Sequence, residues 1–240
     1  MILSIHQPAY SPWLGYFHKI GLSDTFVFFD TTQFEKNSFI NRNKIKTANG
    51  PVWLTVPVKL KDHFDKPIKD IEIADQSWRK KHQKALELNY KKAKYWNEFS
   101  QLIDSFYKKD FKYISDLCYE QLLMFNAALG IDTKIVKASD LSKYESKKND
   151  LVLDICKGLK SNLYVSGGLG RDYIDADRFK RNNIGLYFQD YKHPAYNQLW
   201  GDFVPYMSLW DLLLNEGLNS RKIIFQDNIT KEDLKNNGKK

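Results

Sequence analysis

The sequence predicts an α/β fold in which a mainly parallel sheet carries helices on both faces. The first observation is that short apolar segments rich in β-branched residues alternate with stretches of helical periodicity along the 240 residues. The second is that no internal repeat or low-complexity linker divides the chain, so we expect a single domain over residues 1–240. With a hydrophobic content of 42%, a chain of this length can bury one large core.

The expected elements follow in chain order. A buried strand is expected in "ILSI" at residues 2–5, and a helix that begins near Leu14 ends at Gly21. Aliphatic and aromatic runs predict further strands at 25–30, 51–58, 69–75, 132–139, 162–166 and 184–191. Helical spacing predicts helices at 76–90, 93–109, 112–129, 151–159 and 208–218, with Ser77 as the N-cap of the first and Gly130 as the C-cap of the third. The block around 76–130 is a helical insertion, and we expect it to form a cap over the site.

Composition excludes several classes of protein. No apolar run approaches the roughly 20 residues that cross a bilayer, and the amino terminus lacks the features of a signal peptide. Cys118 and Cys156 lie in helical apolar patterns, which is typical of buried thiols in a reducing compartment. The histidines and cysteines show no metal-ligand spacing, so no metal site is expected. We therefore expect a cytoplasmic protein without a membrane span.

The net charge of +8 allows three interpretations. The excess is mostly lysine and thinly spread, which is typical of a solvated surface. The charge could also attract an anionic small substrate. Polynucleotide binding is the least favoured of the three.

The segment "IHQPAYSPWLGYFHKI" (5–20) concentrates residue types that bind ligands between the first strand and the first helix. His6 ends the strand, and Gln7 precedes a proline that cannot continue it. Tyr10 and Trp13 can stack on a base or a sugar ring, and Gly15 permits close approach to the start of the helix, where anions are favoured. The alternative is that the aromatic residues belong to the core and that His6 is a hydrogen-bonded residue at a strand end.

Three other segments hold candidate binding residues. Amide and guanidinium donors follow the second strand in "DTTQFEKNSFINRNKIKT" (30–47), namely Gln33, Asn41, Arg42 and Asn43. The loop "SGGLGRDYI" (166–174) can cradle an anion with its backbone amides, and its candidates are Ser166, Gly167, Gly168, Gly170, Arg171 and Tyr173. A third segment, 191–213, contributes His193, Tyr196 and Gln198. A polar turn followed by an exposed strand would also explain the first of these segments, and a tight strand-to-helix turn would explain the glycines of the second.

Together these four segments resemble the WbqC-like family of bacterial proteins, from the first strand to about residue 220. The resemblance implies a setting in O-antigen and surface-polysaccharide synthesis, with acyl or amino-acyl transfer to unusual amino sugars among the activities. More distantly, the opening strand, loop and helix resemble the HIGH superfamily of nucleotidylyltransferases, which includes pantothenate synthetase, and this implies a core of that type. Trp13 and Tyr16 stand where that superfamily has its two histidines, so the use of ATP stays open.

The leading hypothesis is a transferase that attaches an acyl or amino-acyl group to the amine of a nucleotide-linked amino sugar. In it, the 166–171 loop and Arg42 hold the diphosphate, Tyr10 and Trp13 stack on the rings, and His6 or His193 is the catalytic base, with His6 narrowly preferred. The co-reactant is ATP or an activated acyl donor, and the sequence does not decide between them. The alternatives are a non-catalytic accessory protein that binds the sugar nucleotide and, less favoured, an RNA-binding protein.

Overall fold

A five-stranded parallel sheet forms the centre of the computed structural model, which describes residues 1–61, 64 and 66–237. Its strands are β1 (Ile2–His6), β2 (Thr25–Phe28), β5 (Lys134–Lys137), β6 (Leu163–Ser166) and β7 (Gly185–Phe188). The order across the sheet is β5-β2-β1-β6-β7, and every neighbouring pair is parallel. This is the order of a doubly wound nucleotide-binding sheet, with its switch point between β1 and β6. The predicted α/β fold is confirmed.

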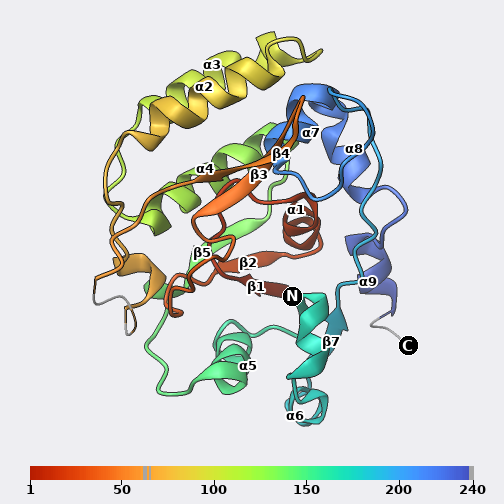
Figure 1. Ribbon diagram of the computed structural model, residues 1–240. Coiled ribbons are helices and arrows are strands. Elements are labelled where there is room, and N and C mark those ends of the chain that lie inside the picture. Colours follow the sequence, from red (N-terminus) through yellow and green to blue (C-terminus); the bar gives the residue numbers. More distant parts are fainter. Residues whose placement is uncertain (62–63, 65, 238–240) are drawn as a thin grey trace.

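Both faces of the sheet are buried by helices, as predicted. Figure 1 shows α1 (Leu14–Gly21) and α4 (Ile114–Leu129) on one face, and α5 (Lys148–Gly158) and α6 (Ala176–Arg181) on the other. Phe26 and Phe28 of β2 join the hydrophobic cluster on the α1 side. Val27, between them, joins the cluster that contains α5 and α6 residues. The two-residue repeat of a strand therefore gives each face its own core, which is why the strands are apolar throughout.

The predicted helical block consists of α2 (Trp78–Tyr90), α3 (Trp96–Lys108) and α4, close to the expected ranges. Gly130 ends α4 in the left-handed conformation (φ 61°), as its assignment as a C-cap requires. Ser77 stands at the N-cap position of α2, but its hydroxyl donates to Asp75 rather than capping the helix. The α4 helix lies on the sheet, where Tyr119 packs against Phe28.

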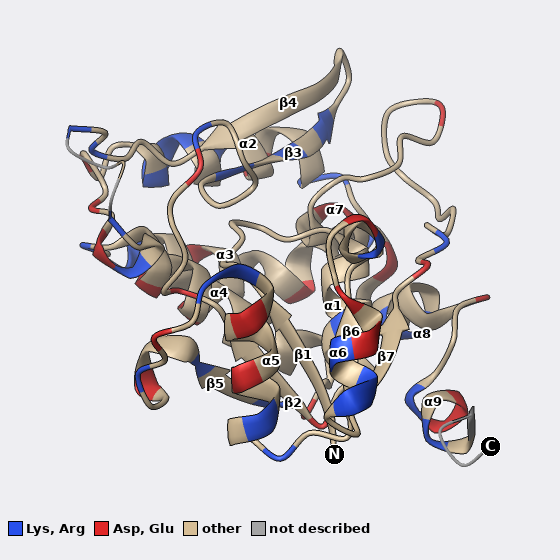
Figure 2. Ribbon diagram, turned by 90° about the horizontal axis from the view of Figure 1, so that it is seen from below, with Lys and Arg blue, Asp and Glu red and all other residues tan. Residues whose placement is uncertain are grey.

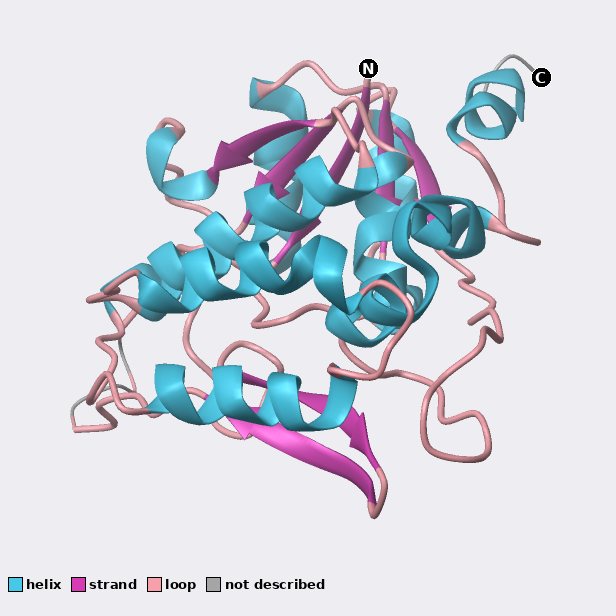
Figure 3. Ribbon diagram, turned by 90° about the horizontal axis from the view of Figure 1, so that it is seen from above, coloured by secondary structure: helices cyan, strands magenta, loops and turns pink. Residues whose placement is uncertain are grey.

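A separate antiparallel hairpin, β3 (Arg42–Thr47) and β4 (Gly50–Thr55), corrects the picture of a single sheet. Figures 1 and 3 show this hairpin apart from the parallel sheet, next to α2. The strand predicted at 51–58 exists, but it pairs with β3. The strand predicted at 69–75 is wrong, because Ile68–Asp70 forms a 3₁₀ turn and only isolated bridges follow. Burial alternates along residues 71–73, as it would in a strand. The backbone hydrogen bonds of this segment, however, go to two different segments, around Pro57 and Lys112.

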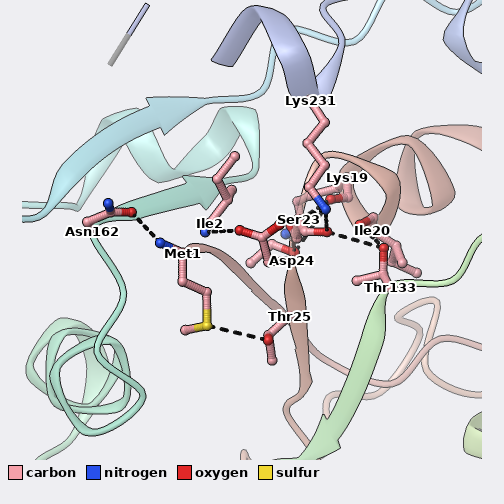
Figure 4. Close-up of polar contacts among 11 residues, drawn as sticks. Met1, Ile2, Lys19, Ile20, Ser23, Asp24, Thr25, Thr133, Asn162 and Lys231 are labelled. Atoms are coloured by element: carbon pink, nitrogen blue, oxygen red, sulfur yellow. Dashed lines mark hydrogen bonds and ion pairs between the residues drawn. The ribbon is translucent and has the colours of Figure 1, made fainter. Parts of the chain in front are cut away.

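The carboxyl-terminal part is helical, and its last helix packs against the amino ends of β1 and β2. It comprises α7 (Leu209–Glu216), α8 (Ser220–Phe225) and α9 (Lys231–Asn237), and further short 3₁₀ turns lie at Ala138–Asp140, Gly168–Asp172 and Gly217–Asn219. Lys231 of α9 contacts the Asp24 carboxylate at 2.8 Å and donates to the Ser23 carbonyl, while Asp24 also accepts the backbone N–H of Ile2 (Figure 4). These contacts fix the edge of the sheet opposite to the carboxyl ends of its strands.

Charge is distributed without a single basic face in the view of Figure 2, where Lys and Arg alternate with Asp and Glu over helices and loops. This agrees with the thin spread of lysine along the sequence. In the part of the chain that the structure describes, no helix is both long and apolar enough to cross a membrane.

Buried histidines predict sensitivity of the fold to acid. Burial lowers the pKa of His82 to about 4, and its Nδ1 accepts the Tyr10 hydroxyl at 2.8 Å. Between pH 6.5 and 4 the unfolded chain binds the additional proton, so the free energy of unfolding falls as the pH falls. The free energy of unfolding, measured with denaturant, should decrease from pH 6.5 to pH 4.5. This decrease should be smaller by about 2 kcal/mol in His82→Gln than in the unmodified protein. Equal losses in both proteins would contradict this assignment, and an exposed neighbour, Lys81→Gln, serves as the control.

Candidate functional site

The carboxyl ends of β1 and β6 mark the position where sheets of this type bind ligands. β1 pairs with β2 as far as His6 and Phe28, but its pairing with β6 ends at Ser4 and Val165. The two strands therefore part after Ser4. His6 and Ser166, both predicted site residues, end these two strands and so lie at the same edge of the sheet.

A buried lysine lies where the strands part. Lys19 of α1 is only 2% exposed, and its Nζ donates to the Ile5 carbonyl at 2.9 Å. Burial lowers the pKa of the Lys19 ammonium to about 7. Beside it, the Ser23 hydroxyl donates to Ser4 at 2.6 Å. The switch point thus has a polar interior beneath His6, which the sequence analysis did not anticipate.

His6 is a neutral imidazole at this edge. Its Nδ1 lies 3.0 Å from the Gln7 carbonyl, so Nδ1 carries the proton and donates it there, and Nε2 keeps its lone pair. Burial, and secondarily the Lys19 ammonium, lower the pKa of His6 to about 3. The ring packs edge-on against Trp13 and Tyr16, at centroid distances of 5.6 and 4.8 Å. Gln7 itself donates to the Thr32 hydroxyl at 3.1 Å.

An aromatic row leads from His6 to the hairpin; we define it as His6, Trp13, Phe39 and Trp53. Successive ring centroids are 5.6, 5.3 and 5.9 Å apart. Phe39 and Trp53 are 45% and 42% exposed, so the outer half of the row is open to solvent. The sequence analysis selected neither Phe39 nor Trp53, because alternation predicts a strand at 51–58 but does not say which rings tertiary contacts leave exposed. The signal that could have found Trp53 is the charged strand that faces it across a short turn.

Two cations border the outer end of the row. The guanidinium carbon of Arg42 lies 4.4 Å from the centre of the Trp53 ring, and Lys44 Nζ lies 4.9 Å from it. Arg42 also donates to the Asn37 carbonyl at 2.5 Å. Its Nε is buried and finds no hydrogen-bond partner among the described residues. A guanidinium group beside exposed rings is suited to an anionic ligand that carries a ring.

Other side chains of the 30–47 segment and of the opening loop make hydrogen bonds within the protein. Asn41 donates to the Val56 carbonyl and Asn43 to the Ser11 carbonyl, which ties the hairpin to the opening loop. The Gln33 amide donates to the Phe64 carbonyl. Tyr10 is fully buried and bonds to His82 and Tyr107.

Gly15 is needed for packing. A Cβ there would lie 2.9 Å from the Tyr191 ring and 3.2 Å from the Trp13 indole nitrogen. Its carbonyl accepts the Gln189 amide at 2.9 Å. The start of α1 is therefore closed in by the segment that follows β7.

The glycine-rich loop follows β6 at the same edge as His6. A Cβ on Gly170 would lie 2.1 Å from Ser166 Oγ, so this glycine serves the tight turn. A Cβ on Gly168 would meet the Gln189 carbonyl at 3.2 Å, whereas around Gly167 the space is open. The remaining candidates point outward, since Arg171 lies over the Phe188 ring and Tyr173 is 61% exposed.

His193 uses both ring nitrogens within the protein. Its Nε2 accepts the backbone N–H of Tyr206 at 3.1 Å, so Nδ1 carries the proton and donates to the Pro194 carbonyl at 2.9 Å. Burial lowers the pKa of His193. The lone pair that a general base would use is therefore engaged, and its role as a base stays a prediction without geometric support.

Tyr196 and Gln198 face a buried carboxylate that the sequence analysis did not select as a site residue. The Asp211 side chain of α7 accepts Tyr196 at 2.8 Å, Gln198 at 2.7 Å and Tyr90 of α2 at 2.6 Å. Asp211 is 0% exposed. The Tyr90 hydroxyl accepts the backbone N–H of Lys46 in β3. This carboxylate links α2, β3, α7 and the segment 191–208.

The structure therefore brings His6 and Trp13 into one row, with Arg42 at its outer end, and sets the glycine-rich loop at the same sheet edge. A hollow of about 690 Å³ lies elsewhere, between α8, α9 and the start of β5, with Thr133, Arg221 and Lys231 among its lining residues. Among the described residues, no group of three or more His, Cys, Asp or Glu side chains could hold a metal ion.

Comparison with known proteins decides the family. A model of the WbqC-like protein family matches residues 7–223. The chain belongs to this family. It is also 35% identical over 217 residues to the "Uncharacterized protein Rv1507c" of Mycobacterium tuberculosis, an alignment that covers 90% of this chain and 94% of that protein. No solved structure matches the chain. The predicted WbqC-like family is confirmed, and membership suggests a role related to polysaccharide biosynthesis.

Removing the charge of Asp211 should destabilise the fold. In Asp211→Asn, an amide N–H₂ replaces an oxygen that now accepts a hydrogen bond, which leaves buried donors unpaired. We expect the free energy of unfolding to fall by about 2–4 kcal/mol, measured by urea denaturation. Tyr196→Phe, which removes one of the three donors, should cost about 1 kcal/mol. An unchanged midpoint and slope for Asp211→Asn would refute the anchoring role.

Lys19 should make stability rise with pH. Its pKa is about 7 in the folded protein and about 10.5 when unfolded, so the unfolded state binds more protons between these values. The free energy of unfolding should rise by about 2 kcal/mol from pH 7 to pH 9. Lys19→Met should abolish this rise, whereas the exposed control Lys84→Met should keep it. A rise of the same size in Lys19→Met would show that other groups cause it.

Proposed function

We propose that this protein binds a nucleotide-linked amino sugar at the carboxyl edge of its sheet and transfers an acyl or amino-acyl group to the sugar amine. Family membership supports the setting in polysaccharide biosynthesis. The position of His6 at the switch point of a doubly wound sheet supports the location of the site.

The observation that carries the proposal is the aromatic row with Arg42 beside it. Exposed rings of Phe39 and Trp53 offer stacking surfaces for a base or a sugar, and such stacking is worth about 1–3 kcal/mol per base. The guanidinium group of Arg42, over the Trp53 ring, supplies a positive charge for a charge-assisted hydrogen bond to a phosphate oxygen. Lys44, at the same ring, adds a second positive charge. A nucleoside diphosphate linked to a sugar carries both kinds of group, rings and anionic phosphates.

The proposed reaction places the amine of the sugar near His6. The amine nitrogen attacks the acyl carbon of an activated donor, a C–N bond forms, and the activating group leaves with the electron pair of its bond. The proton lost by the amine goes to His6 Nε2. This nitrogen has a lone pair to accept it, because the hydrogen bond to the Gln7 carbonyl is made by Nδ1. A bound diphosphate would raise the pKa of His6 from about 3 toward its ordinary value, because a nearby negative charge favours the imidazolium.

A second candidate is a non-catalytic protein that binds the sugar nucleotide. The low pKa of His6 and the engaged Nε2 of His193 favour it. RNA binding has less support, since the basic residues are interspersed with acidic ones (Figure 2).

Calorimetry with a panel of nucleotide-linked amino sugars, including UDP-glucosamine, tests the binding step. Arg42→Ala should weaken binding by about 1.5–3 kcal/mol, roughly 10- to 150-fold. Arg178→Ala is the matched control, because this arginine pairs with Asp150 on the far side of the sheet and should leave affinity unchanged. Failure of the whole panel to bind, or equal affinities for both variants, would contradict the proposed site.

Mass spectrometry of the bound sugar, with ATP and amino acids supplied, separates the two candidates. His6→Gln should lower the single-turnover rate by about 10²- to 10⁴-fold while leaving affinity largely intact. Binding without any mass increase of the sugar would favour the non-catalytic protein.

A further inference from the structure

Tyr206 combines strain with exposure. Its φ of 61° lies in the left-handed region, which glycine adopts freely and a bulky residue rarely does. The side chain is nonetheless 63% exposed, so burial of the ring does not explain the conformation. Its hydroxyl finds no hydrogen-bond partner among the described residues. Strained residues of this kind persist only where the surroundings fix them.

Two contacts fix Tyr206. His193 Nε2 accepts its backbone N–H at 3.1 Å, and the two rings pack edge-on at 4.8 Å. His193 is itself oriented by its bond to Pro194. Two residues after Tyr206, the backbone N–H of Ser208 donates to the Lys44 carbonyl at 2.9 Å, and Ser208 forms a β-bridge with Trp13. Tyr206 is therefore held by His193 and by the anchored residue Ser208 that follows it.

These contacts place Tyr206 beside the aromatic row. Ser208 lies on the edge of β3 at Lys44, and Lys44 is the residue directly opposite Trp53 in the hairpin. A second series of rings runs from the Trp13 and Gly15 region through Tyr191 and His193 to Tyr206. The two series come together at Gly15, where an added Cβ would lie against both Trp13 and Tyr191, and each series ends in an exposed ring.

Trp200, in the same segment, also has a positive φ and serves as a comparison with Tyr206. Its φ is 67°, but its indole N–H donates to the Asn89 carbonyl at 2.9 Å and the side chain is half-buried. A partner within the protein therefore compensates its conformation. Tyr206 has no such side-chain partner among the described residues.

We propose that Tyr206 contacts the sugar of the bound nucleotide sugar, as a specificity-determining residue, and that His193 is a positioning residue that holds Tyr206 in its strained conformation. This rests on the proposed function for the identity of the ligand. The phenol ring packs on an apolar face of the sugar, and its hydroxyl bonds to a sugar hydroxyl or to the amine. His193 acts through the backbone of Tyr206 and does not exchange protons with the substrate.

The decisive variant is Tyr206→Gly. Glycine relieves the strain, so we expect a melting temperature equal to or above that of the unmodified protein, together with affinity at least tenfold lower for the panel member that binds best. Trp200→Gly is the matched control and should lower the melting temperature. A fall in the melting temperature of Tyr206→Gly to that of Trp200→Gly would overturn the proposal whatever the ligand.

Two variants of His193 test positioning against base catalysis. His193→Gln keeps an acceptor near the position of Nε2, so affinity and single-turnover rate should stay within about threefold of the unmodified protein. His193→Leu removes the acceptor and should reproduce the affinity loss of Tyr206→Gly. A turnover rate lost in His193→Gln with affinity intact would make His193 a base and overturn its positioning role. Weak binding in Arg42→Ala with normal binding in Tyr206→Gly would overturn this inference and leave the proposed function standing.

Discussion

The arrangement of this protein depends on one buried carboxylate. Asp211 projects from α7 with no exposed surface, and burial raises the pKa of its carboxyl while the three donors that surround it act in the opposite direction. A charge so far from water is tolerated only when it is fully hydrogen-bonded. Because its donors come from α2 and from the segment 191–208, that requirement holds these elements in fixed positions around α7. The Tyr90 hydroxyl extends the same network to β3.

The network also explains how an open site is kept rigid. The hairpin lies apart from the parallel sheet and could not hold its position by strand pairing with it. Lys46 of β3 is buried and donates to the carbonyls of Gly201 and Asp202, so the hairpin and the segment 191–208 are fixed to each other. Their solvent-facing sides are then free to carry exposed rings, Trp53 on the hairpin and Tyr206 on the segment. Buried hydrogen bonds thus hold the hairpin and the segment 191–208 in place while leaving these rings exposed.

Much of the fold followed from the sequence, because hydrophobic period and glycine position are local signals. The strands of the parallel sheet and the ends of α1 and α4 were predicted for that reason. The hairpin was missed because alternation does not say which sheet a strand joins, and the 69–75 error arose because alternating burial does not require a strand partner. For the site, residue type pointed to the edge and to Arg42. It could not show that Asn43 and Gln198 are bonded inside, nor that Phe39 and Trp53 are exposed, since both depend on tertiary contacts.

Hydrogen-bond accounting separates the histidines where residue type could not. His18 donates from Nε2 to the Ile229 carbonyl and accepts the Gln189 amide at Nδ1. His82 accepts Tyr10 at Nδ1 and donates to the Thr55 backbone, and His193 is engaged at both nitrogens.

At His6, the described residues occupy Nδ1 but provide no hydrogen-bond partner for Nε2. A proton acceptor needs an unused lone pair before its pKa matters, and among these four side chains His6 meets that condition at the edge where the sheet's topology places a ligand.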